Sequence, residues 1–113
     1  MNIQIFGKPK CFDTKKAERY FKERGIKYQL INLTEKAMSK GELNSIKQAV
    51  GGWENLIDQN CKDKDLLALV KHLREEDVEE KILENQRIIK TPVVRNGKKA
   101  TIGYQTEIWK NWE

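Results

Sequence analysis

The first 31 residues change their hydrophobic period twice, and this pattern restricts the fold more than any other feature of the sequence. Residues 2–6 alternate apolar and polar side chains, which is typical of a strand with one buried face. Residues 13–24 place their apolar side chains at helical spacing, and Gly25 suits the end of a helix. Residues 27–31 alternate again. Because a helix that joins two neighbouring strands usually makes them parallel, we expect a βαβ unit at the start of the chain.

The stretch from about residue 38 to residue 88 is predicted to be a helical insertion. Its apolar residues recur every three or four positions in four short segments, and Gly51-Gly52 separates the first two. Asp63 or Asp65 suits the start of the third segment. No linker rich in Pro, Gly or Ser divides the chain, and 113 residues supply material for one core. The whole chain, residues 1–113, is therefore expected to be a single domain.

The end of the chain predicts two strands and a short helix. Residues 92–102 favour a hairpin joined at Asn96-Gly97, a pair that suits a two-residue turn because both positions tolerate positive φ. Thr106 is expected to cap a final helix, whose two tryptophans are expected to pack against the core. The chain is thus predicted to close as a ββα unit.

Charge and cysteine content argue against several function classes. The 22 basic and 17 acidic residues give a net charge of +5, but they are interspersed, and this mixture argues against direct nucleic-acid binding. No run of about 18 apolar residues predicts a membrane helix, and residues 1–10 begin a strand rather than a secretory signal, so a cytoplasmic protein is expected. Two cysteines 50 positions apart and one histidine fit neither a disulfide framework nor a metal site.

Cys11 precedes the predicted first helix, a position that favours a reactive thiol. The thiolate is the reactive form of cysteine, and the N–H groups and positive dipole end of a helix stabilise it. The lysines near Cys11 in the sequence are Lys8, Lys10, Lys15 and Lys16. We therefore expect a lowered pKa for Cys11, with Asp13 or Thr14 as the cap of the helix. Cys61, in the predicted insertion, is expected to be a partly buried bystander.

Two segments resemble the arsenate reductase and Spx family of the thioredoxin-like superfamily. They are KCFDTKKA at residues 10–17 and TPVVRNGKKATIGY at residues 91–104, and the likeness extends over the whole chain. The resemblance implies an α/β, thioredoxin-like βαβ…ββα fold with a mixed four-stranded sheet and a helical insertion.

The resemblance also implies a place for the substrate. In this family pattern the Thr91-Pro92 bond is cis and faces Cys11 across the edge of the sheet. The main chain of Thr91 would then pair with an extended substrate such as glutathione or a peptide thiol. Lys90 and Arg95 would attract the carboxylates of that substrate.

Two departures from the family pattern bear on function. The Spx proteins carry a CxxC motif, but Thr14 occupies the position of the second cysteine here, so no local disulfide switch is available. Glutaredoxin-using arsenate reductases of this family place an arginine directly before the strand-opening proline, where this chain has Thr91. Because a planar guanidinium is hard to replace in holding an oxyanion, a general thiol oxidoreductase is favoured over an arsenate reductase.

The main hypothesis from the sequence is a thiol-dependent oxidoreductase in which Cys11 is the catalytic residue. Its thiolate attacks a small or protein disulfide, and glutathione, another external thiol or glutaredoxin resolves the mixed disulfide. The residues expected to contact substrate are Lys8, Lys10, Thr14, Lys15, Thr91, Pro92 and Arg95. No bound cofactor or metal is expected. The alternative is an Spx-like transcriptional regulator that binds RNA polymerase without turnover, through its basic surface and the insertion.

Overall fold

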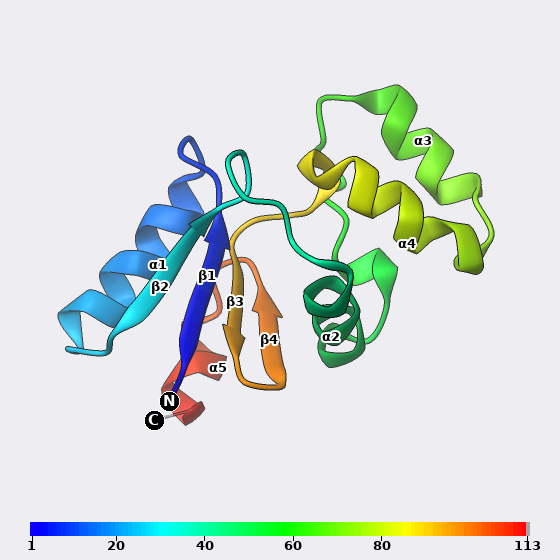
Figure 1. Cartoon of the computed structure of the whole chain (residues 1–113). Helices are drawn as coiled ribbons and strands as arrows, with labels where there is room; N and C mark the ends of the chain where they lie inside the picture. Colours follow the sequence, from blue (N-terminus) through cyan, green and yellow to red (C-terminus); the bar gives the residue numbers. More distant parts are fainter. Residues whose placement is uncertain (113) are drawn as a thin grey trace.

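The computed structural model describes residues 1–112, and its elements follow the βαβ, helical and ββα order predicted from the sequence (Figure 1). The strands are β1 (Ile3–Gly7), β2 (Tyr28–Asn32), β3 (Val93–Asn96) and β4 (Lys99–Ile102). The α-helices are α1 (Phe12–Glu23), α2 (Lys40–Val50), α3 (Lys64–His72), α4 (Glu75–Glu84) and α5 (Thr106–Trp109). The 3₁₀ helices are η1 (Trp53–Asn55), η2 (Gln86–Ile88) and η3 (Lys110–Trp112). None of the helices in this part of the chain is both long and apolar enough to cross a membrane.

The four strands form one mixed sheet in the order β2-β1-β3-β4. β1 and β2 are parallel, whereas β3 is antiparallel to both β1 and β4. The register pairs Gly7 with Asn32 at one end of the sheet and Ile3 with Tyr28 at the other. The predicted α/β class, with a mixed four-stranded sheet, is confirmed.

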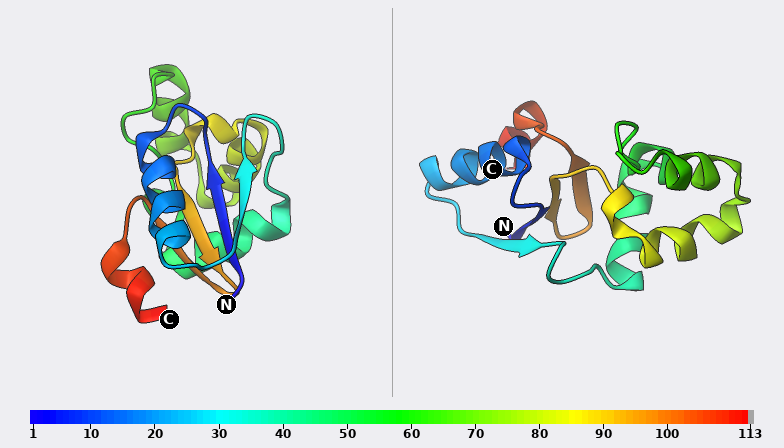
Figure 2. Two further views of the ribbon diagram at one scale, coloured as in Figure 1. Left: turned by 90° about the vertical axis from the view of Figure 1, so that its left-hand side faces the viewer. Right: turned by 90° about the horizontal axis from the view of Figure 1, so that it is seen from above.

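The sheet separates two apolar cores, because successive side chains of a strand point to opposite faces. On one face, Ile3 and Ile5 pack with α1 and with the fully buried Trp109 of α5. On the other face, Phe6 and Val93 pack with α2 and the helices that follow it. Figure 2 shows α1 and α5 on one side of the sheet, with the helices between β2 and β3 extending from the other side.

The start of α1 differs from the sequence prediction. The helix begins at Phe12, and its N-cap is Cys11, which makes no capping hydrogen bond with its side chain. The prediction that Asp13 or Thr14 caps this helix was therefore wrong. Both residues already lie within the first turn of α1, where Thr14 is buried against Gly7, so neither of them is the residue that precedes the helix.

The other predicted helix ends are partly confirmed. Gly25 follows α1 with φ +68°, a left-handed conformation that suits glycine at a helix end. Asp63 caps α3, because its side chain accepts a hydrogen bond from the Leu66 N–H at 3.0 Å. Thr106 lies inside α5, whose N-cap is Gln105, so the prediction that Thr106 caps this helix was wrong.

The β3–β4 hairpin turns one residue later than predicted. Asn96 pairs with Lys99 in the ladder, so Gly97 and Lys98 form the two-residue turn. Only Gly97 of these two has a positive φ, +62°, and glycine is favoured where a turn needs this at its first position. The Asn96 side chain instead accepts a hydrogen bond from the Asn2 N–H at 3.2 Å, which holds Asn96 in the strand.

The helical segment between β2 and β3 is fastened to the loop that follows β1. The ammonium of Lys8 donates hydrogen bonds to the carbonyl oxygens of Arg87, at 2.9 Å, and Ile89, at 3.2 Å. Arg87 also pairs with Asp63, the cap of α3, with 2.7 Å between nitrogen and oxygen. The end of the helical segment is thereby held next to the loop that leads into α1.

Candidate functional site

Cys11 lies beyond the carboxyl end of β1, at the point where the chain enters α1. Its N–H donates a hydrogen bond to the Lys8 carbonyl oxygen at 3.1 Å, which closes the connecting loop. As the N-cap residue, Cys11 has an extended backbone conformation with φ −87° and ψ 114°. Its side chain is half-buried and adjoins the first N–H groups of the helix, which have no partner within the helix itself.

The residue before β3 brings a main-chain carbonyl to the sulfur. The Cys11 thiol donates to the Thr91 carbonyl oxygen, with 3.5 Å between Sγ and oxygen. The Thr91-Pro92 bond is cis, as the family resemblance implied. Pro92 is buried, and its carbonyl oxygen accepts a hydrogen bond from the Gly103 N–H at 2.8 Å. Two segments 80 residues apart in the sequence therefore meet at the sulfur.

Thr14 supplies a buried hydroxyl in the first turn of α1. The residue is 4% exposed. While Cys11 is a protonated thiol, the Thr14 hydroxyl has no hydrogen-bond partner within residues 1–112. Thr14 also packs directly on Gly7, where a Cβ would overlap Cγ2 of Thr14 and lie 2.7 Å from its Oγ1. Position 7 must therefore be glycine for α1 to approach the end of β1 this closely.

The pKa of the Cys11 thiol is lowered by donors that act against its burial. Partial burial is the largest single effect and raises the pKa, because it disfavours the charged form. Hydrogen bonds from the side chains of Thr14 and Thr91, and from the backbone N–H groups of Thr14 and Asp13, together outweigh burial and lower the pKa. The protonated Cys11 thiol donates to the Thr91 carbonyl oxygen. When Cys11 loses its proton, the sulfur instead accepts hydrogen bonds from the neighbouring donors, which stabilise the thiolate.

The structure brings most of the predicted site residues to one end of the sheet. Thr14, Thr91 and Pro92 lie around Cys11, as described above. Lys10 and Lys15 are exposed beside it in the chain. The Lys8 ammonium, however, is bound to two backbone carbonyl oxygens of the helical segment, so its observed role is to hold this segment in place.

Arg95 lies away from this end of the sheet. It pairs with Gln4 in the ladder, three residues before Gly7 along β1, which places it about 10 Å from that strand end. Its guanidinium donates to the Gln4 side chain at 3.3 Å, the Ser45 hydroxyl at 3.4 Å and the Gly97 carbonyl at 3.2 Å. These contacts tie β1, α2 and the hairpin turn together.

Two residues of this region were missed by the sequence predictions. Gly7 is needed for the contact with Thr14. The sequence indicates this through a lone glycine at the end of an apolar strand, which often marks the close approach of another backbone. Phe12 follows Cys11 directly and is 78% exposed. The sequence feature that indicates it is an aromatic residue outside the apolar stripe of α1.

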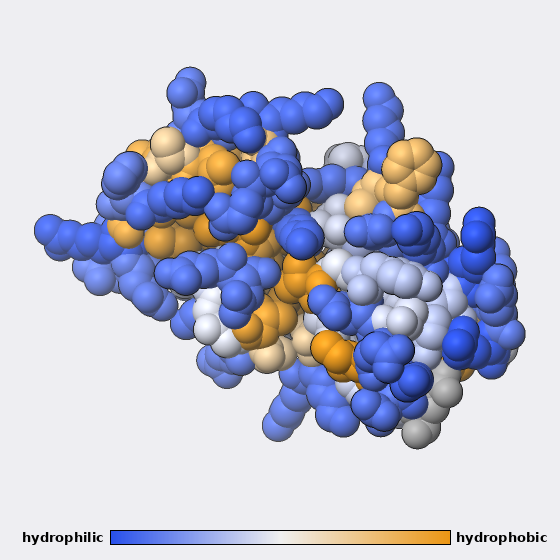
Figure 3. Space-filling model, turned by 180° about the vertical axis from the view of Figure 1, so that it is seen from behind, coloured by the Kyte–Doolittle hydropathy of each residue, from blue (hydrophilic) through white to orange (hydrophobic). Residues whose placement is uncertain are grey.

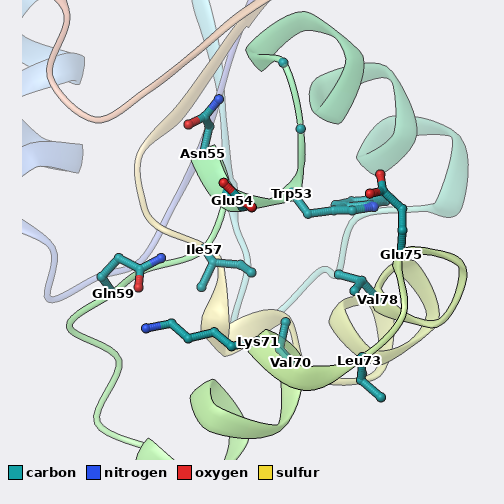
Figure 4. Close-up of a pocket in the computed structure, with 12 residues that line it drawn as sticks. Trp53, Glu54, Asn55, Ile57, Gln59, Val70, Lys71, Leu73, Glu75 and Val78 are labelled. Carbon is teal, nitrogen blue, oxygen red and sulfur yellow. The ribbon is translucent and has the colours of Figure 1, made fainter.

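A separate hollow of about 590 Å³ lies within the helical segment. Figure 4 shows side chains of mixed character around it, among them Trp53, Glu54 and Lys71. All of its lining residues lie between Gly51 and Val78, so it is no part of the Cys11 site. Within residues 1–112, no group of three His, Cys, Asp or Glu side chains is arranged to hold a metal ion.

Fold and site together define a thioredoxin-like protein with a half-buried cysteine at the start of its first helix and a cis-proline bond opposite. The model of the ArsC family matches residues 6–112, and the chain belongs to that family. The resemblance to arsenate reductases and Spx proteins that the sequence motifs indicated is therefore confirmed.

Three known proteins illustrate this similarity. The global transcriptional regulator Spx 2 of Oceanobacillus iheyensis is 29% identical over 109 residues, which cover 95% of this chain and 80% of that protein. The arsenate reductase from Vibrio cholerae superposes with a TM-score of 0.84 at 22% identity, covering 98% of this chain and 97% of that one. The glutaredoxin-like NrdH-redoxin from Escherichia coli gives a TM-score of 0.50 at 15% identity, covering 100% and 96%. The two structures share the fold with this chain.

Replacement of Thr14 with Val tests the role of its hydroxyl. Valine keeps the shape that packs on Gly7 but cannot donate to the thiolate, so the pKa of Cys11 should rise. Thr14→Ser retains the hydroxyl and should keep the pKa lowered. The pH dependence of Cys11 alkylation by iodoacetamide, followed by mass spectrometry, measures both. An unchanged pKa in Thr14→Val would contradict this role.

Replacement of Gly7 with Ala tests the close approach of β1 and α1. The added Cβ overlaps Thr14, so the free energy of unfolding should fall by about 1–3 kcal/mol. Thr14→Ala in the same chain should restore part of this loss, because it removes the overlapping atoms. Gly41→Ala, in α2 with no atom within 4 Å of the new Cβ, is the matched control and should not destabilise. Urea unfolding measures all four chains, and equal stabilities of Gly7→Ala and the parent would disprove the contact.

Proposed function

We propose that this protein is a thiol-dependent oxidoreductase whose nucleophile is Cys11. The observation that carries the proposal is the place of the sulfur, at the N terminus of α1, where donors of the first turn lower its pKa. A lowered pKa raises the fraction of thiolate at neutral pH, and the thiolate is the form that attacks disulfides. Membership of the ArsC family and the thioredoxin-like fold agree with thiol chemistry at this position.

The reaction begins when the Cys11 thiolate attacks one sulfur of a disulfide. A bond forms between the two sulfurs, the original disulfide breaks, and the leaving sulfur departs as a thiolate that takes a proton from water. An external thiol such as glutathione then attacks the mixed disulfide as its own thiolate. Because Thr14 stands where a second cysteine would be needed, this resolving thiol comes from outside the protein.

The main chain at Thr91 would orient the substrate. Its carbonyl oxygen lies 3.5 Å from the Cys11 sulfur, so a backbone that pairs with this segment would bring its own sulfur close to the nucleophile. Lys10 and Lys15 are exposed near Cys11 in the chain, and Lys90 is exposed next to Thr91; their ammonium groups would attract carboxylates of glutathione or of a peptide.

The positions of Arg87 and Arg95 favour this reaction over reduction of an oxyanion. Thr91, and no arginine, precedes Pro92. The guanidinium of Arg87 pairs with Asp63, and that of Arg95 is bound on the sheet by Gln4 and its neighbours. Clamping a multiply charged oxyanion beside a thiolate would require guanidinium groups that are directed at the sulfur.

Mixed-disulfide formation tests the proposed function. Bis(2-hydroxyethyl) disulfide should add to Cys11, and the rate should reach half its maximum at a pH below about 8.5, the ordinary cysteine value, because the thiolate persists to lower pH. Glutathione should then release the adduct. Cys11→Ser should abolish the reaction, whereas Cys61→Ser, which changes a residue only 6% exposed, is the matched control and should retain it. Adducts confined to Cys61 would rule the proposal out.

A second candidate function is transcriptional regulation through contact with RNA polymerase. It is favoured by the 29% identity to the regulator Spx 2 over 95% of this chain. Apolar side chains also gather over the helical segment on the face turned away from the viewer in Figure 1, as Figure 3 shows, and this surface would suit a protein partner. The reaction of Cys11 would then be unnecessary for binding.

Pull-down of purified bacterial RNA polymerase separates the two functions. A regulator should retain the polymerase equally well as the parent chain and as Cys11→Ser, since contact does not need the sulfur. An oxidoreductase should form mixed disulfides and leave the polymerase in solution. Loss of polymerase binding in Cys11→Ser would contradict regulation by contact alone.

A further inference from the structure

Phe12 is the most exposed large apolar side chain among the described residues, and it directly follows Cys11. It is 78% exposed, although it is the first residue of α1. The buried stripe of that helix is formed instead by Ala17, Tyr20 and Phe21. An exposed phenyl ring gains nothing from the hydrophobic core, so the fold itself does not account for an aromatic residue at this position.

An apolar hollow extends this surface. The Lys15 ammonium lies 6.0 Å from the centre of the Phe12 ring, and Lys15 also lines a hollow of about 250 Å³ together with Pro9 and Leu30. Leu30 is 46% exposed even though it belongs to β2. Phe12, Lys15 and the hollow are therefore continuous. We call this surface the Cys11 rim and define it by Pro9, Phe12, Lys15 and Leu30.

The surroundings of the Cys11 rim carry an excess of positive charge. Lys8 and Lys15 line the hollow, and Lys10 is exposed next to Cys11 in the chain. The nearby carboxylates are Asp13, which lies 3.9 Å from the Lys16 ammonium, and Glu18, which lines the hollow and accepts a hydrogen bond from the Tyr28 hydroxyl at 3.0 Å. Lysines outnumber carboxylates around the rim. A ligand of this surface therefore meets lysine ammonium groups around an apolar centre.

We propose that the Cys11 rim docks polypeptide substrates: Cys11 acts on disulfides carried by acidic proteins that present an apolar side chain beside the disulfide. This inference rests on the proposed function and names its substrate class. Aromatic residues surrounded by a polar rim are the usual anchors of protein interfaces. Complementary charge speeds the encounter of the partners, and a small uncharged disulfide would gain from neither feature.

The reaction with such a protein is balanced by two molecules of a low-molecular-weight thiol. The Cys11 thiolate bonds to one sulfur of the protein disulfide, whose second sulfur leaves as a thiolate and is protonated by water. The first small thiol attacks the Cys11 sulfur and releases the partner in its dithiol form. The second small thiol restores the Cys11 thiolate, and the two small thiols leave joined as an oxidised disulfide.

Two synthetic peptides and one small disulfide test the proposal. The acidic peptide carries an internal disulfide flanked by Leu and Glu residues, and the basic peptide has Lys in place of each Glu. Bis(2-hydroxyethyl) disulfide reports the reactivity of the sulfur itself. The measured quantity is the rate of Cys11 adduct formation with each peptide divided by the rate with the small disulfide.

The full chain should react at least about tenfold faster with the acidic peptide than with the basic one. Phe12→Ala should lower the acidic-peptide ratio about tenfold, and Phe12→Tyr should keep it, because tyrosine preserves the aromatic anchor. Lys15→Glu should reverse the preference between the peptides. Ile108→Ala, an exposed apolar residue on α5, is the matched control and should leave every ratio unchanged.

Two outcomes would overturn the proposal, and they differ from each other. If the small disulfide reacts at Cys11 but Phe12→Ala leaves the acidic-peptide ratio unchanged, the docking surface is disproved and the proposed function stands. If no disulfide reacts at Cys11, the proposed function fails and the docking surface fails with it.

Discussion

The contact between Gly7 and Thr14 is the constraint on which the rest of the site depends. Because Gly7 has no side chain, the first turn of α1 rests directly on the end of β1, and Thr14 is buried there. This approach sets the direction in which the helix starts and places Cys11 at its N-cap. The sulfur then lies between the donors of the first turn and the carbonyl oxygen of Thr91. A larger residue at position 7 would move both the helix and the sulfur.

The site also depends on how the long helical segment is attached. The segment leaves the sheet after β2 and returns at β3, just after Thr91, whose carbonyl oxygen accepts from the Cys11 thiol. Its return is held by the Lys8 ammonium, which binds the Arg87 and Ile89 carbonyl oxygens just before Thr91. The charged group that sequence reasoning assigned to substrate thus positions the backbone opposite the sulfur. The segment itself packs with Phe6 and Val93 on the face of the sheet away from α1.

The order of strands and helices could be predicted because each part of the chain keeps its own hydrophobic period, and the family motifs then indicated the topology and the cis bond before Pro92. Capping was predicted poorly at Asp13, Thr14 and Thr106. A capping side chain is favoured by its chemistry, but Thr14 packs on Gly7 from inside the first turn of α1 and does not precede the helix. Arg95 was predicted to contact substrate because it is close to Pro92 in the sequence. In the structure it lies further along β3, away from the strand end, and its guanidinium donates to the Ser45 hydroxyl. Such choices depend on contacts between distant segments, which periodicity does not encode.

The hydroxyl that occupies position 14 has a consequence for the behaviour of the protein under oxidative stress. Where a second thiol stands three residues further along a helix, an oxidant converts the pair to a disulfide that reduction readily reverses. Threonine cannot form such a bond, and the remaining cysteine, Cys61, is buried among apolar residues of the other core. Peroxide would therefore leave Cys11 as a sulfenic acid, open either to rescue by small thiols or to irreversible sulfinic acid formation. The concentration of those thiols, rather than the protein, would decide between the two fates.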